Sequence, residues 1–229
     1  DNDLLDGGFG NDTLLGGDGN DNLDDSLGSN HFDGGAGDDR VFSATFNQLG
    51  TAVQADGGTG DDTFDLSYAS TALLDGSAGN DTLTMFGVRD ATVLGGAGDD
   101  LINIGVNGFY SVFSDGDSRF DEQLRVDGGD GADTVLVSTS GSVADGRSSI
   151  ALSGGAGNDS LLLEDTFAGS FFGASFGVTH ATLDGGDGDD RLTASGVVQL
   201  ELSGGAGSDT FVLTERQWRT QLEGDRFVT

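Results

Sequence analysis

Cysteine, proline and lysine are absent from the 229 residues, and histidine occurs only at His31 and His180. Without cysteine the chain can form neither disulfides nor thiolate metal sites, and without proline no prolyl isomerisation slows its folding. Zinc and copper favour histidine or cysteine, and the two histidines are far apart in the sequence. No apolar run approaches the roughly 20 residues that a membrane-spanning helix needs. The absences therefore argue against a disulfide scaffold, a zinc site and membrane insertion.

Positive charge is scarce, because nine arginines stand against 40 acidic residues and give a formal net charge of −31. Such a charge repels nucleic acid and anionic membranes, so neither is expected as a partner. The acidic residues are 35 aspartates and only five glutamates. Aspartate beside glycine favours tight turns and cation coordination, whereas general solubility would use glutamate as freely.

Glycine is abundant, with 42 residues, and it recurs in a fixed pattern. The nine residues that begin at Gly95, GGAGDDLIN, fit the template G-G-x-G-x-D-x-U-x, in which U is a large apolar residue. The other copies begin at Gly7, Gly16, Gly34, Gly57, Gly76, Gly128, Gly154, Gly185 and Gly204. An eroded copy begins at Asp25, and the chain opens within a copy whose sixth residue is Asp3. These recurrences indicate a repeat architecture, and we expect the chain to be a piece of a longer protein.

The spacing of the copies sorts them onto two edges of a solenoid. Early copies are nine residues apart, but after Gly34 the intervals lengthen to between 19 and 33 residues. Two nonapeptides make 18 residues, so we interpret 18–19 residues as one coil and any excess as an insertion. The Asp3 turn, the Gly16 and Gly34 copies and all copies from Gly57 onward then share one edge. The copies at Gly7 and Asp25 share the other edge, which is expected to carry variable loops and no glycine turn beyond Thr45.

Residues that flank each turn alternate between apolar and mixed side chains. Before the Gly95 turn, Ala91 and Val93 enclose Thr92, and after it Ile102 and Ile104 enclose an asparagine. This alternation is typical of strands with one buried face, and it recurs in every coil. The sequence therefore predicts an all-β solenoid with four inward-facing columns. A helix is considered only around Trp218, from Thr214 to Leu222.

The turn itself has the composition of a calcium site. Three glycines permit positive φ angles and leave backbone carbonyls uncovered, and the sixth-place aspartate adds a carboxylate. Turns stacked one strand spacing apart, about 4.8 Å, would surround each gap with oxygens. Ca²⁺ takes 6–8 oxygen ligands in flexible geometry, which suits this arrangement better than Mg²⁺ does. The alternative is that the aspartates only cap turns and aid solubility, but stacked like charges destabilise a sheet without cations.

These repeats resemble the RTX (repeats-in-toxin) calcium-binding nonapeptide family over residues 1 to about 213. The resemblance implies a right-handed parallel β-roll, with Ca²⁺ between successive turns, in a bacterial protein exported by type I secretion. It implies that sixth-place side chains are ligands, which here are Asp3, Asp12, Asp21, Asn30, Asp39, Asp62, Asp81, Asp100, Asp133, Asp159, Asp190 and Asp209. It also implies turn carbonyl ligands, at Gly16, Gly19, Gly34, Gly37, Gly57, Gly60, Gly76, Gly79, Gly95, Gly98, Gly128, Gly131, Gly154, Gly157, Gly185, Gly188, Gly204 and Gly207.

The chain departs from the usual pattern of the family, in which both edges carry nonapeptides. Here only residues 1–42 do so, while residues 43–213 form long coils with turns on one edge. We therefore expect one long file of calcium ions and at most one or two on the other edge, about 8–10 in all. Residues 214–229 are expected to begin a C-terminal cap.

Two insertions on the second edge carry residues that could serve a specific function. Residues 105–123 include Asp115, Asp117 and Asp121, which imitate an EF-hand loop without its glycine and final glutamate; an acidic turn and an extra calcium site both remain open. Residues 164–180 include four phenylalanines, which either close the core or form a surface for a partner or a second copy.

The sequence favours a calcium-binding structural module that folds after secretion, outside the cell or on a bacterial cell surface. The alternative is an adhesin or surface-layer module that assembles through its loops. A polysaccharide-modifying enzyme on a β-helix is disfavoured, because no nucleophile–base spacing is found, and Asp65 and Glu201 are isolated acidic residues on strands. We therefore expect no catalytic residues in this chain.

Overall fold

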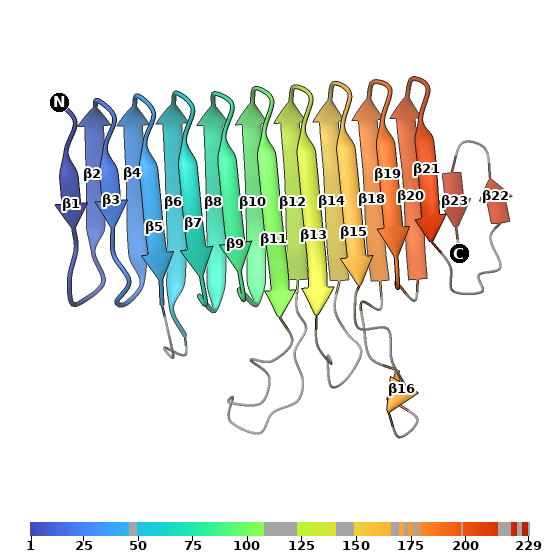
Figure 1. The fold of residues 1–229 in the computed structure, drawn as a ribbon, viewed down its shortest axis with the longest axis horizontal. Coiled ribbons are helices and arrows are strands. Elements are labelled where there is room, and N and C mark those ends of the chain that lie inside the picture. Colours follow the sequence, from blue (N-terminus) through green and yellow to red (C-terminus); the bar gives the residue numbers. More distant parts are fainter. Residues whose placement is uncertain are drawn as a thin grey trace.

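The computed structural model describes residues 1–45, 50–107, 123–140, 149–165, 170–171, 174–175, 178, 180–197, 199–214, 221–223 and 226–228. Every regular element within this part of the chain is a β-strand, and the strands form two long sheets and one two-stranded hairpin (Figure 1). Neighbouring strands from consecutive coils are parallel throughout both long sheets, apart from the C-terminal end. The expectation of an all-β parallel β-roll is confirmed.

The strands alternate between the two long sheets along the chain. Sheet 1 contains β1 (Leu4–Asp6), β3 (Asn22–Asp24), β5 (Arg40–Ala44), β7 (Thr63–Ser67), β9 (Thr82–Phe86), β11 (Leu101–Asn107), β13 (Thr134–Ser140), β15 (Ser160–Asp165), β19 (Arg191–Ser195) and β21 (Thr210–Thr214). Sheet 2 contains β2 (Thr13–Asp18), β4 (Asn30–Ala36), β6 (Ala52–Thr59), β8 (Thr71–Ala78), β10 (Asp90–Ala97), β12 (Gln123–Asp130), β14 (Ser149–Ala156), β18 (His180–Asp187), β20 (Gln199–Ala206), β23 (Arg226–Val228) and β22 (Gln221–Glu223). The hairpin pairs β16 (Ser170–Phe171) with β17 (Ala174–Ser175).

The two sheets are joined along two different edges. At the top of Figure 1, short turns lead from each strand of sheet 2 into the next strand of sheet 1; we call this side the glycine edge. At the bottom, sheet 1 returns to sheet 2 through connections of varied length, and we call this side the loop edge. The predicted division between a regular edge and a variable edge is therefore present.

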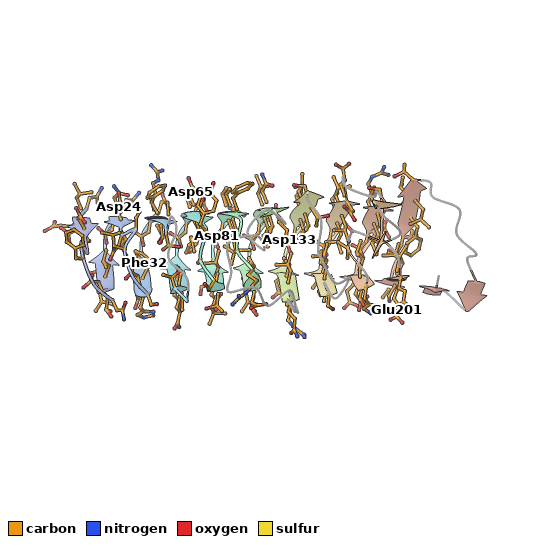
Figure 2. The ribbon with its side chains drawn as sticks, turned by 90° about the horizontal axis from the view of Figure 1, so that it is seen from below. Asp24, Phe32, Asp65, Asp81, Asp133 and Glu201 are labelled. Carbon is orange, nitrogen blue, oxygen red and sulfur yellow. The ribbon has the colours of Figure 1, made fainter. Side chains whose placement is uncertain are left out.

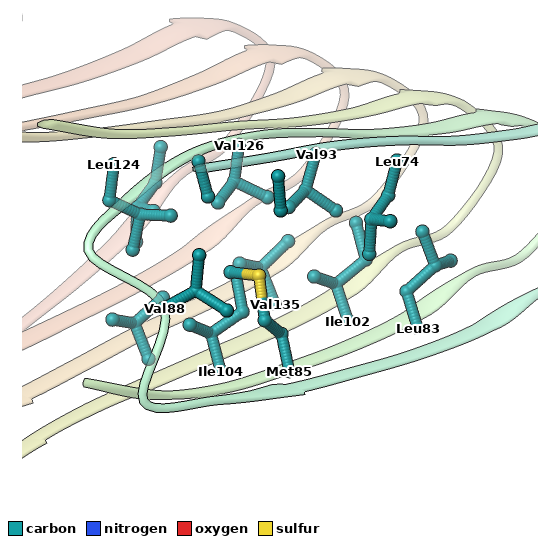
Figure 3. Close-up of a cluster of buried hydrophobic side chains, with 14 of the residues drawn as sticks. Leu74, Leu83, Met85, Val88, Val93, Ile102, Ile104, Leu124, Val126 and Val135 are labelled. Carbon is teal, nitrogen blue, oxygen red and sulfur yellow. The ribbon is translucent and has the colours of Figure 1, made fainter. Parts of the chain in front are cut away.

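The core lies between the two sheets, which form two layers when the molecule is viewed along the plane of the sheets (Figure 2). Phe32 and Phe64 are fully buried there, and the close-up of the central coils shows Val93 and Val126 of sheet 2 opposite Ile102 and other residues of sheet 1 (Figure 3). The register stacks equivalent residues of successive coils, so that each inward position becomes a column. The four predicted apolar columns are confirmed.

Short turns close the loop edge where no insertion is present. They place Tyr68, Gly87 or Gly196 in the left-handed region, with φ of 66°, 65° and 79°. The next residue in each turn is Ala69, Val88 or Val197, all at most 5% exposed. The expectation that this edge lacks glycine turns beyond Thr45 is therefore wrong in part, because single glycines serve here without the longer template.

The C-terminal end changes from parallel to antiparallel pairing. Strand β23 pairs antiparallel with β20, and β22 pairs antiparallel with β23. The helix considered for Thr214 to Leu222 is not found in the described parts of that range, since Thr214 ends β21 and Gln221 begins β22. Trp218 lies outside the described residues. No helix among the described residues is long and apolar enough to cross a membrane.

Candidate metal centre

All predicted sixth-place aspartates except Asp12 lie at the glycine edge, where each turn enters a strand of sheet 1. Eight of them are at most 3% exposed: Asp21, Asp39, Asp62, Asp81, Asp100, Asp133, Asp159 and Asp190. Figure 2 shows Asp81 and Asp133 between the sheets, whereas Asp24, Asp65 and Glu201 lie on the outer faces. A row of buried carboxylates with no basic residue among them needs a compensating interaction.

One oxygen of each buried carboxylate has such an interaction. The Oδ1 atom accepts a hydrogen bond from the backbone N–H of the sixth-place aspartate in the preceding coil. In the central coils, Asp81 N donates to Asp100 Oδ1 at 2.7 Å and Asp100 N donates to Asp133 Oδ1 at 2.8 Å. The series runs from the N–H of Asp3 to the carboxylate of Asp209. We call this series the inner ladder.

The second oxygen has no hydrogen-bond partner. The Oδ2 atoms of all eight buried aspartates of the glycine edge are buried and unpartnered, as is Oδ2 of Asp12 on the loop edge. Buried polar atoms in native proteins are almost always paired. A regular row of exceptions at equivalent positions therefore indicates a shared ligand that the protein atoms themselves do not provide.

The unpartnered oxygens line a cradle at the first glycine of each turn. A Cβ atom built on Gly34 would lie 2.5 Å from Asp39 Oδ2 and 2.6 Å from the carbonyl oxygen of Gly57 in the next coil. The same pair of oxygens surrounds the first glycines Gly16, Gly57, Gly76, Gly95, Gly128, Gly154 and Gly185. First glycines are also skipped in the strand register, which pairs Leu94 with Asp127 and then Gly96 with Gly129. Each cradle therefore brings together a carboxylate oxygen of one coil and a carbonyl oxygen of the next.

The fourth glycine of the template is required for the coils to approach one another. Gly98 has φ of +132°, and a Cβ atom there would overlap the carbonyl oxygen of Gly79 in the preceding coil. Only glycine adopts this angle without strain and leaves room for the neighbouring backbone. The glycines thus set the spacing at which the cradle oxygens converge.

A second ladder lies outside the first, along the fifth-place residues. Here the side chain points the other way, to the following coil: Asn80 Oδ1 accepts the N–H of Asp99 at 2.9 Å, and Asp99 Oδ1 accepts that of Ala132 at 2.8 Å. Ala132 has no acceptor for the next coil, and the series resumes where Asn158 accepts the N–H of Asp189 at 2.7 Å. We call it the outer ladder, and it joins successive coils with polarity opposite to that of the inner ladder.

Burial changes the acidity of the cradle carboxyls. It raises the pKa of Asp62 to about 7; the hydrogen bond from the Asp39 N–H lowers this value and the nearby Asp81 carboxyl raises it again. Burial likewise raises the pKa of Asp81, Asp100, Asp133 and Asp159 to about 6. The ionised forms are disfavoured in the protein alone, and a positive charge in the cradles would favour them again.

The donor set fits calcium. Carboxylate and carbonyl oxygens are the ligands of hard cations, and Ca²⁺ accepts many of them in flexible geometry. Within the described residues no group of three or more His, Cys, Asp or Glu side chains is arranged to hold a metal ion. The cradle instead combines one carboxylate per gap with backbone oxygens, as the sequence predicts for stacked turns.

The two ends of the predicted file differ from its middle. Asp3 is exposed, and its backbone N–H donates to Asp21 Oδ1 at 2.6 Å. Asp209 Oδ1 accepts the N–H of Asp190 at 3.1 Å, and its Oδ2 lies beside Gly204, where no carbonyl of a further coil is among the nearest atoms. Both residues continue the inner ladder, but neither forms a complete cradle.

On the loop edge, the predicted ligands Asp12 and Asn30 lie in adjacent coils, and Asp12 N donates to Asn30 Oδ1 at 3.1 Å. Asp25, which the sequence template did not single out as a ligand, is 2% exposed and also has a buried, unpartnered Oδ2. The EF-hand-like residues and most of the two predicted partner segments, 105–123 and 164–180, lie outside the described residues.

A comparison with protein families finds matches to the model of the RTX calcium-binding nonapeptide repeat (4 copies) at residues 1–24, 15–47, 73–84, 151–165 and 182–196. Comparisons with curated proteins and with solved structures found no match. Repeats of this family bind several Ca²⁺ ions. They form a structural calcium-binding module rather than a catalytic one, and proteins that carry them are typically secreted through type I systems.

Proposed function

This chain carries RTX calcium-binding repeats, and from that premise we propose that it is a module whose folding is driven by calcium along the glycine edge. Each ion would lie in a cradle between two coils, held by the Oδ2 of one sixth-place aspartate and by turn carbonyls. The described residues provide eight such cradles, from Gly16 to Gly185. The aspartate and glycine ligands predicted from the sequence are proposed as the site, with Asp3 and Asp209 at its two ends.

The observation that carries the proposal is the row of buried carboxylates whose second oxygen has no partner. An uncompensated buried charge costs several kcal/mol. Each turn repeats this cost at the strand spacing, where like charges also repel. Divalent cations in the cradles would remove both penalties, and the backbone fold then follows from the alternation of the strands.

Because each cradle is shared by two coils, cation binding and coil stacking support each other. At ten times the dissociation constant a single site contributes about RT ln 11, or ~1.4 kcal/mol, to the folded state. Extracellular calcium modules have dissociation constants of about 10⁻⁴–10⁻³ M, far above cytosolic calcium. We therefore infer that the module stays unfolded in the cell, extended by its net charge of −31, and folds after export.

The domain division remains part of the proposal. Residues 1–213 would form a single roll, with nonapeptide turns on both edges over residues 1–42 and nonapeptide turns on the glycine edge alone over residues 43–213. Residues 214–229 would begin a cap. The antiparallel pairing of β23 with β20 supports a change of structure at this end, since it covers the last parallel strand of sheet 2.

Calcium titration followed by circular dichroism and light scattering tests the proposal. Starting from chelator-treated protein, we expect a cooperative gain of β-structure as Ca²⁺ approaches the millimolar range, at constant mass. Mg²⁺ at the same concentrations is the matched control and should give less structure. A near-native spectrum in excess chelator would exclude calcium-driven folding.

Light scattering during the same titration also tests the alternative of an adhesin or surface-layer module. If mass grows with protein concentration as the chain folds, assembly through the loop edge becomes the primary function. Phe86 on that edge is 38% exposed and makes an edge-to-face contact with Tyr68, with ring centroids 5.6 Å apart, and these rings form a surface that such assembly could use. Constant mass would favour the monomeric folding module.

A further inference from the structure

The first two turns of the loop edge have exchanged a carboxylate between two places of the template. The turn that begins at Gly7 has the usual order, with glycine first and Asp12 sixth. The turn stacked on it has Asp25 first and Asn30 sixth. The second turn therefore contains one acidic side chain, as the template does, but this side chain is at the first place of the turn instead of the sixth.

Asn30 continues the inner hydrogen-bond pattern but has no oxygen left for a cation. Its Oδ1 accepts the N–H of Asp12 at 3.1 Å, as sixth-place aspartates do on the glycine edge. Its Nδ2 donates to the carbonyl of Leu27 at 3.4 Å. The atom that corresponds to the unpartnered Oδ2 of the glycine edge is thus an NH₂ group, which cannot ligate a metal.

Asp25 places a carboxylate oxygen beside the first glycine of the preceding coil. Its Oδ1 accepts the N–H of Leu27 at 3.0 Å, and this bond fixes the side chain. A Cβ atom built on Gly7 would overlap Asp25 Oδ2 and would lie 3.1 Å from Asp12 Cβ. On the glycine edge, the corresponding place beside Gly16 is taken by the carbonyl oxygen of Gly34. The Asp25 carboxylate therefore occupies the position of a carbonyl ligand.

Both carboxylates at this place have an oxygen without a partner. Asp25 is 2% exposed, and the Oδ2 atoms of Asp25 and Asp12 are buried with no hydrogen bond. The Asp25 carboxyl lies close enough to the Asp12 carboxyl for the two to interact electrostatically. The two carboxylates together match the charge of one divalent cation.

We propose that Asp12 and Asp25 form a calcium site of their own on the loop edge, in which the first-place carboxylate of Asp25 replaces the sixth-place carboxylate lost at Asn30. The site rests on its own residues and does not require that the glycine-edge cradles bind calcium. It differs from those cradles because it holds two carboxylates in one gap. Their oxygen atoms make the site selective for hard divalent cations.

The number of bound ions tests this proposal. The full chain and its variants are equilibrated with saturating Ca²⁺, separated from free metal, and the calcium per chain is measured by mass spectrometry. Asp25→Asn keeps the acceptor for Leu27 but removes the charged oxygen, so we expect one ion fewer than in the wild type. An unchanged count would mean that the two carboxyls share a proton rather than a cation, and would overturn the proposal.

A double variant keeps the test decisive if Asp25→Asn disturbs the first coils. Asp25→Gly combined with Asn30→Asp restores the template order on this turn. If the wild type already holds an ion here, the double variant should bind the same number of ions, whereas Asp25→Gly alone should bind one fewer. If the wild type holds none, the double variant should gain one ion, and that gain would contradict the proposal.

Hydrogen exchange separates this site from the glycine-edge file. In the wild type, calcium should protect peptides from residues 1–32 and from residues 180–214, and Asp25→Asn should reduce protection only in the first group. If residues 180–214 fail to respond to calcium while residues 1–32 respond through Asp25, the glycine-edge function fails and the loop-edge site stands. If residues 1–32 respond equally in Asp25→Asn, the loop-edge site fails.

Discussion

The two edges of the solenoid solve the same problem with opposite chemistry. Each must reverse the chain between two sheets and close the end of the core. On the glycine edge the residue that closes the core is a buried aspartate such as Asp100, and on the loop edge it is an apolar residue such as Val88. The apolar closure is complete in the protein alone, whereas the charged closure has an unpartnered oxygen in each of the eight coils from Asp21 to Asp190. The difference makes the glycine edge dependent on the ionic composition of the solvent, whereas the loop edge is independent of it wherever apolar residues such as Val88 close the core.

A change of pH should give the largest effect, because it alters many cradles of the glycine edge at once and leaves the apolar turns of the loop edge unchanged. Burial holds the pKa of Asp62 at about 7 and that of Asp81 at about 6, above the ordinary 3.8 of the unfolded chain. The calcium-free folded state therefore binds more protons than the unfolded state between about pH 4 and pH 7, so its stability falls as the pH rises through this window. Calcium-free protein should show more β-structure by circular dichroism at pH 5 than at pH 8.

Light scattering must accompany this measurement, because the isoelectric point is near 4.1 and aggregation at low pH would imitate folding. Equal or greater β-structure at pH 8 in the calcium-free protein would show that the cradle carboxyls do not oppose folding. The comparison of the two edges would then lose its electrostatic basis.

Glycine substitutions compare the edges directly. Gly98→Ala on the glycine edge strains a φ of +132° and drives a Cβ into the backbone of the preceding coil, which should cost about 3 kcal/mol or more. Gly87→Ala on the loop edge has φ of +65° and only a flexible Tyr68 ring at 3.0 Å, which should cost about 1–2 kcal/mol. Urea unfolding in saturating calcium measures both, and equal costs would contradict the tighter coil spacing at the glycine edge.

A charge substitution separates the cradle from the surface of the same turn. Asp100→Asn retains the acceptor for the Asp81 N–H but replaces the unpartnered Oδ2, so we expect one ion fewer and a loss of about 1–3 kcal/mol. Asp99→Asn is the matched control, because it removes the same charge one residue away, on an exposed side chain of the outer ladder. Calcium counting and urea unfolding measure both variants. If Asp99→Asn loses as much bound calcium and as much stability as Asp100→Asn, the effect comes from the net charge and not from the cradle.

The smallest effect is expected where the outer ladder is interrupted. Ala132→Asn would supply the missing acceptor for the N–H of Asn158 and stabilise the fold by about 0.5–1.5 kcal/mol. Ala132→Leu, which fills the same exposed position without an acceptor, is the control. Thermal unfolding in saturating calcium should show a higher midpoint for the asparagine variant alone. A rise in both variants would point to packing instead of the hydrogen bond.

The sequence predicts the roll and its core because both follow from exact repetition. Apolar residues equivalent to Val93 and Ile102 recur in every coil, so each further copy strengthens the prediction. The burial of Val93 and Ile102 confirms it. The sixth-place aspartates were found in the same way. The repeat alone does not predict that one oxygen of each carboxylate is hydrogen-bonded and the other unpartnered, because this depends on how adjacent coils are placed relative to one another.

Departures from the template could not be recovered from repetition. The left-handed Tyr68, Gly87 and Gly196 each close a short turn with one special residue, and a single residue leaves no pattern to recognise. Asp25 was missed because the template expects glycine at its place. The signal was present as a pair, an acidic residue gained at the first place and lost at the sixth in the same turn, and it becomes meaningful only when the stacking of Gly7 on Asp25 is known.

The opposite polarity of the two ladders gives the roll two growing ends. A coil added at the N-terminal end finds a carboxylate of the existing stack ready to accept its sixth-place N–H, as Asp100 does for Asp81. A coil added at the C-terminal end finds a fifth-place side chain ready to accept its N–H, as Asn80 does for Asp99. Each exposed end is therefore a template that orders the next coil before its core is complete. Folding that begins in any coil can therefore spread along the chain toward both ends of the stack.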